Sequence, residues 1–211
     1  MVAGTHGKTT TTTCLSHLLN YAGLDPSYLI GGVPFDLPSS SHFGQGQYFV
    51  IEGDEYDTAF FDKESKFLHY RPNLALLMSL EFDHADIFAN SEAMEKMFRK
   101  FMHLVPEDGI IFHCADWKRL GTILMEERPR AKQISFGFSD EAGHMIEDFS
   151  EGEDGLSFTL DGTRFKSSLT GKFNAQNLVA ALLAARAVGV KDEILVKALA
   201  GFRGVKRRQE V

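Results

Sequence analysis

A short segment near the start of the chain combines the residue types that bind phosphate. Its sequence is Gly4-Thr5-His6-Gly7-Lys8-Thr9. Glycines let backbone N–H groups turn toward phosphate oxygens, and a helix beginning here would add the positive end of its dipole. The Lys8 ammonium would contact the β- and γ-phosphates of a nucleotide, and the Thr9 hydroxyl would ligate Mg²⁺. A glycine is usual at the position of Val2, so we expect a shorter variant of the phosphate-binding loop.

A glycine turn before an ordinary helix is the alternative interpretation of this segment. The run of five threonines at positions 9–13 disfavours it, because β-branched residues are poor helix formers and a purely structural helix start would not need them. The residues expected to hold the nucleotide here are Gly4, Thr5, His6, Gly7, Lys8, Thr9 and Thr10.

Two groups of carboxylates each follow an apolar run. Glu52-Gly53-Asp54-Glu55-Tyr56-Asp57 comes after residues 48–51, and Glu81-Phe82-Asp83-His84-Ala85-Asp86 comes after residues 74–80. The carboxyl ends of parallel strands face the ligand crevice of an α/β sheet. Carboxylates gathered there need a cation, and Mg²⁺ with ATP phosphates fits the first group. A histidine among carboxylates suits a second metal position. Solvated surface clusters are the alternative for both groups.

The elements that must position these residues alternate between strands and helices. Hydrophobic periodicity predicts strands over residues 27–30, 48–51, 74–80 and 110–112, and helices over residues 9–22, from 91 onward, 118–127, 174–188 and 192–199. Over residues 133–169 the period changes to two, and Asp161-Gly162 is a strong hairpin turn. This order predicts an α/β fold: a mostly parallel sheet like that of P-loop NTPases, flanked by helices, with an antiparallel β addition at one edge.

Composition excludes several other classes of protein. The 211 residues include 22 Lys and Arg against 29 Asp and Glu, a formal charge of −7. This acidic balance disfavours binding to nucleic acid or to an anionic membrane. The two cysteines are too few for a disulfide scaffold, so we expect a cytoplasmic protein. The phosphate motif begins within a few residues of Met1, and we expect the chain to be one domain of a longer protein.

At this point the residues resemble the Mur ligase family, ATP-dependent enzymes that build the peptide of bacterial peptidoglycan. The resembling motifs are Gly4-Thr5-His6-Gly7-Lys8-Thr9-Thr10, Glu52-Gly53-Asp54-Glu55, Asp83-His84, Gly171-Lys172-Phe173-Asn174-Ala175-Gln176-Asn177 and Arg207-Arg208. The resemblance implies that residues 1–211 are the central ATP-binding domain, with an N-terminal UDP-sugar domain and a C-terminal domain outside this chain.

The resemblance also implies roles for single residues. Lys8, Glu52 and His84 would carry the catalysis, and Thr9, Glu52 and His84 would ligate Mg²⁺. Asn174 and Asn177 would contact the adenine end of ATP, and Arg208 would approach the phosphates. The two asparagines lie three apart at a helix start, where amides can contact an adenine edge, although helix capping by Asn174 is an alternative. Lys206-Arg207-Arg208 could likewise be a solvated basic run.

Departures from the family pattern bear on ligand geometry. Ser79 stands where relatives usually carry asparagine, and Phe173 replaces a frequent histidine. Some relatives use a carbamylated lysine as a metal bridge. Lys96 and Lys100 are candidates for it by position alone, and the wet face of a helix is the better interpretation of both.

Within the family, residues 56–63 and 81–88 look most like members that join UDP-N-acetylmuramate to L-alanyl-γ-D-glutamyl-meso-diaminopimelate in peptidoglycan recycling. Members that add L-alanine alone are the next most similar. ATP would activate the muramoyl carboxylate as an acyl phosphate, which the amine then attacks. A regulatory nucleotide-binding module and a kinase-like phosphotransferase are the rival hypotheses. We expect the chain alone to bind nucleotide without ligating, and its oligomeric state stays open.

Overall fold

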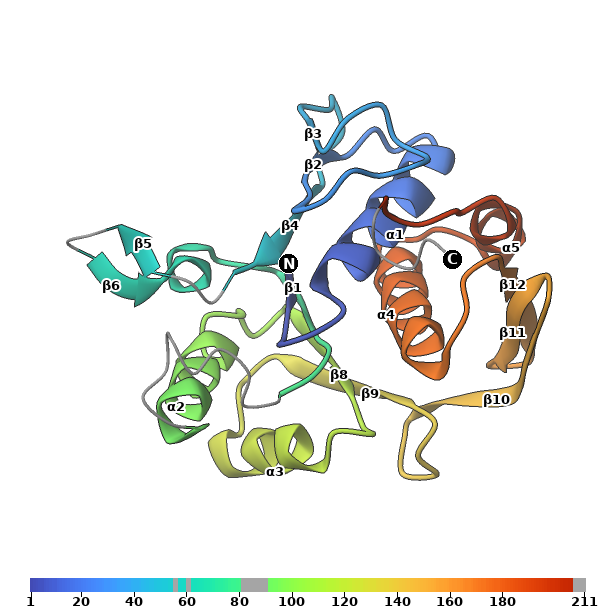
Figure 1. Cartoon of the computed structure of the whole chain (residues 1–211). Coiled ribbons are helices and arrows are strands. Elements are labelled where there is room, and N and C mark those ends of the chain that lie inside the picture. The colour runs from blue at the N-terminus through green and yellow to red at the C-terminus, as the bar shows by residue number, and fades with distance from the viewer. Residues whose placement is uncertain (55–56, 60–61, 81–90, 207–211) are drawn as a thin grey trace.

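The structure is a computed structural model that describes residues 1–54, 57–59, 62–80 and 91–206 (Figure 1). Within these residues ten strands form one sheet, in the order β12-β11-β10-β9-β8-β7-β1-β4-β2-β3. The strands are β1 (Val2–Ala3), β2 (Ser27–Leu29), β3 (Ser41–His42), β4 (Phe49–Gly53), β7 (Leu74–Leu77), β8 (Ile110–Cys114), β9 (Lys132–Gly137), β10 (His144–Gly152), β11 (Gly155–Leu160) and β12 (Thr163–Ser167). Neighbouring strands from β2 to β10 are parallel, and β10, β11 and β12 are antiparallel. The predicted fold class is confirmed.

The antiparallel edge begins where β10 changes partner. Its first residues pair in parallel with β9, and its later residues pair antiparallel with β11. A register shift lies between Glu147 and Ser150, and Asp148 there has a positive φ of 46°. The predicted hairpin turn is confirmed, since Leu160 pairs with Thr163 across Asp161-Gly162 and both turn residues have positive φ.

Two short pieces of sheet were not predicted. β3 lies in a segment for which no strand was predicted, and it pairs antiparallel with β2 at the opposite edge of the sheet. A separate hairpin consists of β5 (Asp57–Ala59) and β6 (Asp62–Ser65), and the short 3-10 helix η1 (Lys66–His69) follows it. This hairpin projects away from the main sheet and leads the chain from β4 back toward β7 (Figure 1).

Helices cover both faces of the sheet (Figure 1). One face carries α1 (Lys8–Tyr21), α4 (Lys172–Ala187) and α5 (Asp192–Ala200), and the other carries α2 (Ser91–Met102) and α3 (Lys118–Glu127). All five predicted helices are confirmed. Each predicted first or last residue lies within two positions of the observed one, and α3 has the predicted bounds. Lys96 and Lys100 are exposed on α2, as the wet-face interpretation requires.

Alternating side chains of the central strands explain the two helical layers. Leu76 and Phe112 pack into the cluster with α1, α4 and α5, whereas Leu77 and Ile111 pack into the cluster with α2 and α3. A parallel strand that is buried on both faces favours apolar residues at every position, and β7, Leu-Ala-Leu-Leu, has them at all four. Each fully buried large apolar side chain contributes about 1.5–3 kcal/mol relative to exposure. The two cores therefore fix the sheet from both sides.

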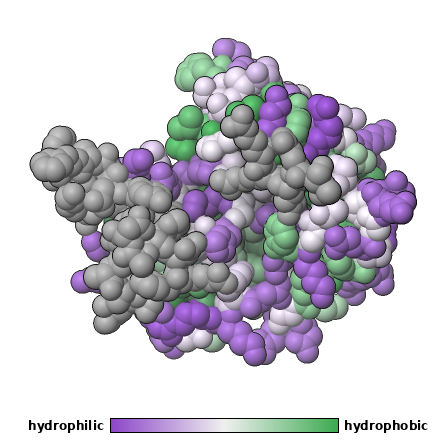
Figure 2. Space-filling model, viewed as in Figure 1, coloured by the Kyte–Doolittle hydropathy of each residue, from purple (hydrophilic) through white to green (hydrophobic). Residues whose placement is uncertain are grey.

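Where Figure 2 colours the surface by hydropathy, most of the side chains are hydrophilic, and the hydrophobic ones form small patches between them. Among the helices that the structure describes, none is both long and apolar enough to cross a bilayer. Burial raises the pKa of both cysteine thiols, and that of Cys114 reaches about 12.

Candidate functional site

The loop between β1 and α1 lies at the carboxyl edge of the parallel sheet. Gly4 has a φ of +134°, and a Cβ at this position would lie 2.8 Å from the backbone nitrogen of Ser79. Gly7 precedes α1 in the left-handed conformation, with a φ of 84°. Both positions therefore require glycine, because other residues rarely adopt these angles and would clash here. The helix begins directly at Lys8, so the amino end of α1 faces the loop.

Ser79, at the carboxyl end of the neighbouring strand, supports this loop. Its carbonyl oxygen accepts a hydrogen bond from Thr5 N at 3.1 Å, and its hydroxyl accepts one from His6 N at 2.8 Å. The Ser79 hydroxyl and carbonyl thus accept hydrogen bonds from two successive backbone N–H groups of the loop. Ser79 therefore has a structural role in the loop.

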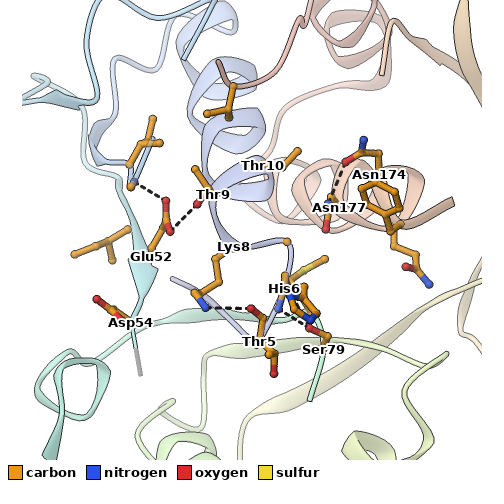
Figure 3. Close-up of a pocket in the computed structure, with 18 of the residues that line it drawn as sticks. Thr5, His6, Lys8, Thr9, Thr10, Glu52, Asp54, Ser79, Asn174 and Asn177 are labelled. Atoms are coloured by element: carbon orange, nitrogen blue, oxygen red, sulfur yellow. Dashed lines mark hydrogen bonds between the residues drawn. The ribbon is translucent and has the colours of Figure 1, made fainter. Parts of the chain in front are cut away.

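Lys8 folds back over the loop that precedes it. Its Nζ donates to Gly4 O at 2.7 Å and lies 3.4 Å from Thr5 O (Figure 3). Two carbonyl oxygens of the loop therefore hold the Lys8 ammonium beside the cavity. The side chain has rotatable bonds enough to turn toward an anion bound in the loop.

Glu52 and Thr9 meet beside the amino end of α1. Thr9 Oγ1 donates to Glu52 Oε2 at 3.1 Å, and Gly31 N donates to Glu52 Oε1 at 2.6 Å (Figure 3). Glu52 lies at the end of β4, next to β1 in the sheet, and Thr9 is 2% exposed. A carboxylate and a hydroxyl, both of them hard oxygen donors, therefore lie side by side next to the phosphate loop.

A cavity of about 1030 Å³ opens over these residues. On one side of the loop it has a wall that we call the amide wall, made of Trp117, Phe173, Asn174, Gln176 and Asn177. On the other side lies a wall that we call the charged wall, made of Glu52, Asp54, Lys66 and Tyr70. Figure 3 shows the labelled members of the two walls on opposite sides of Lys8.

The amide wall is built on the first turns of α4. Asn174 and Asn177 are 2% and 5% exposed, and Asn177 Nδ2 donates to Asn174 Oδ1 at 3.3 Å. Asn174 Nδ2 donates to Thr170 O at 2.8 Å. The helix cap is Gly171, so the capping role considered for Asn174 is wrong. A Cβ at Gly7 would lie only 2.2 Å from Asn177 Oδ1, so α4 touches the phosphate loop directly.

The charged wall is built on the end of β4 and on η1. Lys66 Nζ and Asp54 Oδ2 are 3.4 Å apart, with side chains 41% and 40% exposed. Tyr70 follows η1 and lines the same side of the cavity. The charged wall thus has a cation, two carboxylates and a phenol, and one of the carboxylates, Glu52, contacts Thr9 directly.

The structure brings most of the predicted site residues together. The predicted site residues that line the cavity are Thr5, His6, Gly7, Lys8, Thr9, Thr10, Glu52, Asn174 and Asn177. Gly4 lies at the start of the loop and accepts the lysine hydrogen bond. His84 and Arg208 lie outside the described residues, and so do the acidic residues around His84. Among the described residues, no three His, Cys, Asp or Glu side chains form a group that could hold a metal ion.

Sequence reasoning missed Lys66, Tyr70, Trp117 and Gln176. Trp117 follows Asp116 just beyond the carboxyl end of β8. The rule that residues at the carboxyl ends of parallel strands face the ligand crevice, which drew attention to Glu52, would have found it. No comparable signal pointed to Lys66, because the hairpin before it was not predicted.

A phosphate loop between a strand and a helix, with a carboxylate after the adjacent parallel strand, defines a P-loop nucleotide-binding α/β domain. The family model of the Mur ligase middle domain matches residues 2–185. The chain therefore belongs to the Mur ligase family, whose members are ATP-dependent ligases.

Relatives of known name are similar over the whole chain. The UDP-N-acetylmuramate--L-alanyl-gamma-D-glutamyl-meso-2,6-diaminoheptandioate ligase of Escherichia coli (strain K12) is 41% identical over 100% of this chain and 46% of its own length. The UDP-N-acetylmuramate--L-alanine ligase of Chlorobium phaeobacteroides (strain BS1) is 36% identical over 100% of this chain and 44% of its own length. The chain thus spans about half the length of these curated relatives.

Solved structures of Mur ligases superpose closely on this chain. The UDP-N-acetylmuramate:L-alanyl-gamma-D-glutamyl-meso-diaminopimelate ligase from Neisseria meningitides matches with a TM-score of 0.86 at 41% identity, covering 98% of this chain and 66% of that one. A murein peptide ligase from Psychrobacter arcticus 273-4 matches with a TM-score of 0.84 at 35% identity, covering 100% of this chain and 48% of that one.

Proposed function

We propose that this chain is the central, ATP-binding domain of a murein peptide ligase. The full-length enzyme joins UDP-N-acetylmuramate to L-alanyl-γ-D-glutamyl-meso-diaminopimelate in peptidoglycan recycling. The observation that carries the proposal is the hydrogen bond between Thr9 and Glu52 beside the phosphate loop. It joins two oxygen donors at the amino end of α1, and relatives that are 41% identical to this chain bear the corresponding name.

The phosphates of ATP bind in the loop of residues 4–9. Backbone N–H groups and the amino end of α1 attract their charge, and Lys8 leaves its carbonyl partners to contact the β- and γ-phosphates. Thr9 and Glu52 hold Mg²⁺, since hydroxyl and carboxylate oxygens are ligands that this ion prefers. We propose His84 as a further ligand and Arg208 as a contact to the phosphates. The ion supplies charge neutralisation on the transferring phosphoryl group.

The two walls of the cavity accept different parts of the reactants. The amide wall has aromatic side chains beside three carboxamides, which suits a heterocyclic base. The charged wall has Lys66 among its members, which suits the anionic sugar substrate whose carboxylate must reach the γ-phosphate. ATP then lies across the phosphate loop, with its base on one side and the acceptor on the other.

The reaction proceeds in two steps. A carboxylate oxygen of UDP-N-acetylmuramate attacks the γ-phosphorus, the bond to the β-phosphate oxygen breaks, and ADP leaves with that electron pair. The amine of the tripeptide attacks the acyl phosphate carbonyl, loses a proton and expels phosphate. Phosphoryl transfer depends on positioning and charge neutralisation, and Lys8 provides both from this chain.

The remaining half of the enzyme supplies what this chain lacks. We propose an N-terminal domain that binds the UDP-sugar and a C-terminal domain that helps to hold the peptide. Residues 1–211 then bind nucleotide without ligating. ATP and UDP-N-acetylmuramate are cytoplasmic metabolites, and we place the enzyme in the cytoplasm.

The full-length protein, incubated with ATP, UDP-N-acetylmuramate and either the tripeptide or L-alanine, tests the proposal. We expect amide product with the tripeptide and little with L-alanine, measured by mass spectrometry. Product with L-alanine alone would favour the second candidate, an L-alanine ligase, which the 36% identical relatives support. ATP consumption without an amide from either amine would contradict both.

Lys8→Ala tests the nucleotide site itself. We expect the affinity for Mg²⁺-ATP to fall by about thirtyfold to hundredfold, because charge-assisted hydrogen bonds to the phosphates are lost. Calorimetric titration measures the effect, and Lys166→Ala on the exposed side of β12 is the control. Equal affinity in the Lys8→Ala variant and the control would show that the loop does not bind the nucleotide.

A further inference from the structure

The loop that follows β2 makes a backbone contact with Glu52, which we propose as a metal ligand. We call residues 31–36 the β2 loop. Gly31 N donates to Glu52 Oε1 at 2.6 Å, and Thr9 Oγ1 donates to the other oxygen, Oε2, at 3.1 Å (Figure 3). The Gly31 N–H and the Thr9 hydroxyl together determine how the Glu52 carboxylate is turned.

The β2 loop lies between the phosphate loop and residues 202–206, which we call the α5 segment because they follow α5. A Cβ at Gly32 would lie 3.0 Å from Thr9 Cγ2 and 2.7 Å from Val205 Cγ1. Gly32 is thus enclosed between a residue of α1 and a residue of the α5 segment. Glycine restricts the backbone less than any other residue, so the place of Gly31 depends on the contacts that the β2 loop makes.

Backbone hydrogen bonds join the β2 loop to the α5 segment. Phe35 N donates to Gly204 O at 3.1 Å, and Lys206 N donates to Val33 O at 2.9 Å. These two hydrogen bonds lie on either side of an antiparallel bridge between the segments. Gly204 has a φ of +89°, an angle that favours glycine. The two segments therefore pair like a short piece of sheet.

A charged pair closes this contact at the end of the β2 loop. Asp36 Oδ2 accepts from Arg203 N at 2.6 Å, and Asp36 Oδ1 accepts from Arg203 Nε at 2.7 Å. The guanidinium also donates to Phe35 O at 3.0 Å. The Asp36 side chain is only 8% exposed. Hydrogen bonds to a charged group are roughly twice as strong as neutral ones, so this pair contributes more to holding the loop than either backbone hydrogen bond does.

The α5 segment is itself fixed to the rest of the domain. Phe202 is fully buried in the core, and its carbonyl oxygen accepts from Ser168 Oγ at 3.1 Å. A Cβ at Gly204 would lie 3.0 Å from Leu169 Cδ2, so the segment passes close to the residues that precede α4. The α5 segment is thus a firm support, and the charged pair transmits its position to the β2 loop.

We infer that Asp36 and Arg203 are positioning residues for the metal site. They hold the β2 loop where the Gly31 N–H fixes one oxygen of Glu52, so that the carboxylate is oriented before Mg²⁺ binds. Groups that orient a metal ligand raise the affinity for the metal. Neither Asp36 nor Arg203 lines the cavity, so both act through Glu52. The inference rests on the proposed function, since it assumes that Glu52 holds Mg²⁺.

The affinity for ATP with and without Mg²⁺ tests the inference independently of turnover. Calorimetric titration of the full-length protein with ATP, once in excess Mg²⁺ and once in EDTA, gives the factor by which the ion strengthens binding. Asp36→Ala removes the acceptor of both Arg203 donors. We expect it to lower this Mg²⁺ factor about threefold to tenfold and to leave the affinity in EDTA unchanged. Asp140→Ala, at an exposed position before β10, is the matched control and keeps the wild-type factor.

Arg203→Ala and Arg203→Lys test the pair while the backbone hydrogen bonds of the segment remain. The Arg203 side chain is 64% exposed, so neither change disturbs the core. We expect Arg203→Ala to lower the Mg²⁺ factor about twofold to fivefold. Arg203→Lys keeps a charged donor for Asp36 and restores most of the factor. Arg130→Ala, at an exposed position before β9, is the control for the loss of a surface arginine.

The outcomes distinguish this inference from the proposed function. A wild-type Mg²⁺ factor in either Asp36→Ala or Arg203→Ala would overturn the inference and leave the nucleotide site intact. Equal losses of ATP affinity with and without the ion would also overturn it, because they would show a purely structural role. If the wild-type protein bound no ATP, or bound it no better with Mg²⁺, the proposed function would fail as well.

Discussion

The two walls of the cavity differ in how firmly their polar groups are held. On the amide wall, Asn174, Asn177 and Gln176 each donate to a protein acceptor, and the first two are buried. On the charged wall, Lys66 and Asp54 are 3.4 Å apart and about two-fifths exposed. Exposed ion pairs of this kind contribute little stability and rearrange easily. One wall is preorganised for a ligand of fixed shape, and the other can adapt to its ligand.

The elements behind the walls account for this difference. α4 is buried along most of its length, where it packs against α1 and the sheet. The charged wall instead depends on the end of β4 and on η1, a single short turn. A rigid wall suits a nucleobase, which is the same in every turnover. An adaptable wall suits the acceptor group of the proposed reaction, which changes from carboxylate to acyl phosphate.

Glu52→Gln is expected to have the largest effect among changes to the walls. Glu52 accepts from Thr9 and Gly31 with its two oxygens, and an amide can accept with only one. The loss of charge also weakens a Mg²⁺ ligand set. We expect kcat to fall at least about hundredfold, with an increased requirement for Mg²⁺.

Glu147→Gln, at an exposed position of β10, is the control for this change. Steady-state ATP turnover at several Mg²⁺ concentrations measures both variants. A Glu52→Gln enzyme with wild-type kcat and Mg²⁺ dependence would remove Glu52 from the site, and the charged wall would lose its proposed link to the metal.

Asn177→Leu tests whether the amide wall is preorganised, in contrast to the charged wall. The change removes the donor to Asn174 and places an apolar group against the phosphate loop. We expect the free energy of unfolding to fall by about 1–3 kcal/mol and ATP affinity to fall about tenfold, because a buried acceptor loses its partner. Urea denaturation and nucleotide titration measure the two effects. Lower affinity at unchanged stability would mean that the amide wall is not preorganised.

The sequence predicted the phosphate loop and the layers well, because strong local patterns specify them. Glycines with positive φ and an apolar residue at every position of a central strand leave few alternative structures. β6 was missed because Asp62-Lys63-Glu64-Ser65 has no apolar alternation, and β3 because it has only two residues. The asparagines of α4 came from the family resemblance, with capping as the local alternative. Their contact with Gly7 is set by tertiary packing, which no local pattern encodes.

The contact of Gln176 with Asp116 is also set by tertiary packing and could not be predicted from a local pattern. Gln176 stands in the motif of residues 171–177 without a role of its own, 60 positions from Asp116, which belongs to no motif. Their hydrogen bond depends on β8, β9 and α4 meeting at one edge of the sheet. Sequence patterns indicate which elements form, whereas contacts of this kind follow only from their arrangement in space.

Lys66→Ala is expected to have the smallest effect on the fold and tests the adaptable wall. We expect the free energy of unfolding to change by less than about 1 kcal/mol, because the ion pair with Asp54 is exposed on both sides. The Kd of Mg²⁺-ATP stays the same. The KM of the anionic sugar substrate rises about threefold to tenfold, since an attractive charge is lost near its carboxylate.

Lys66→Arg keeps the charge and restores most of the affinity for the sugar substrate, whereas Lys132→Ala on β9 is a control for the loss of a surface lysine. Initial rates with the sugar substrate varied at saturating ATP measure these changes. If Lys66→Ala weakened ATP and left the KM of the sugar substrate unchanged, the charged wall would belong to the nucleotide. The division of the cavity between base and acceptor would then have to be reversed.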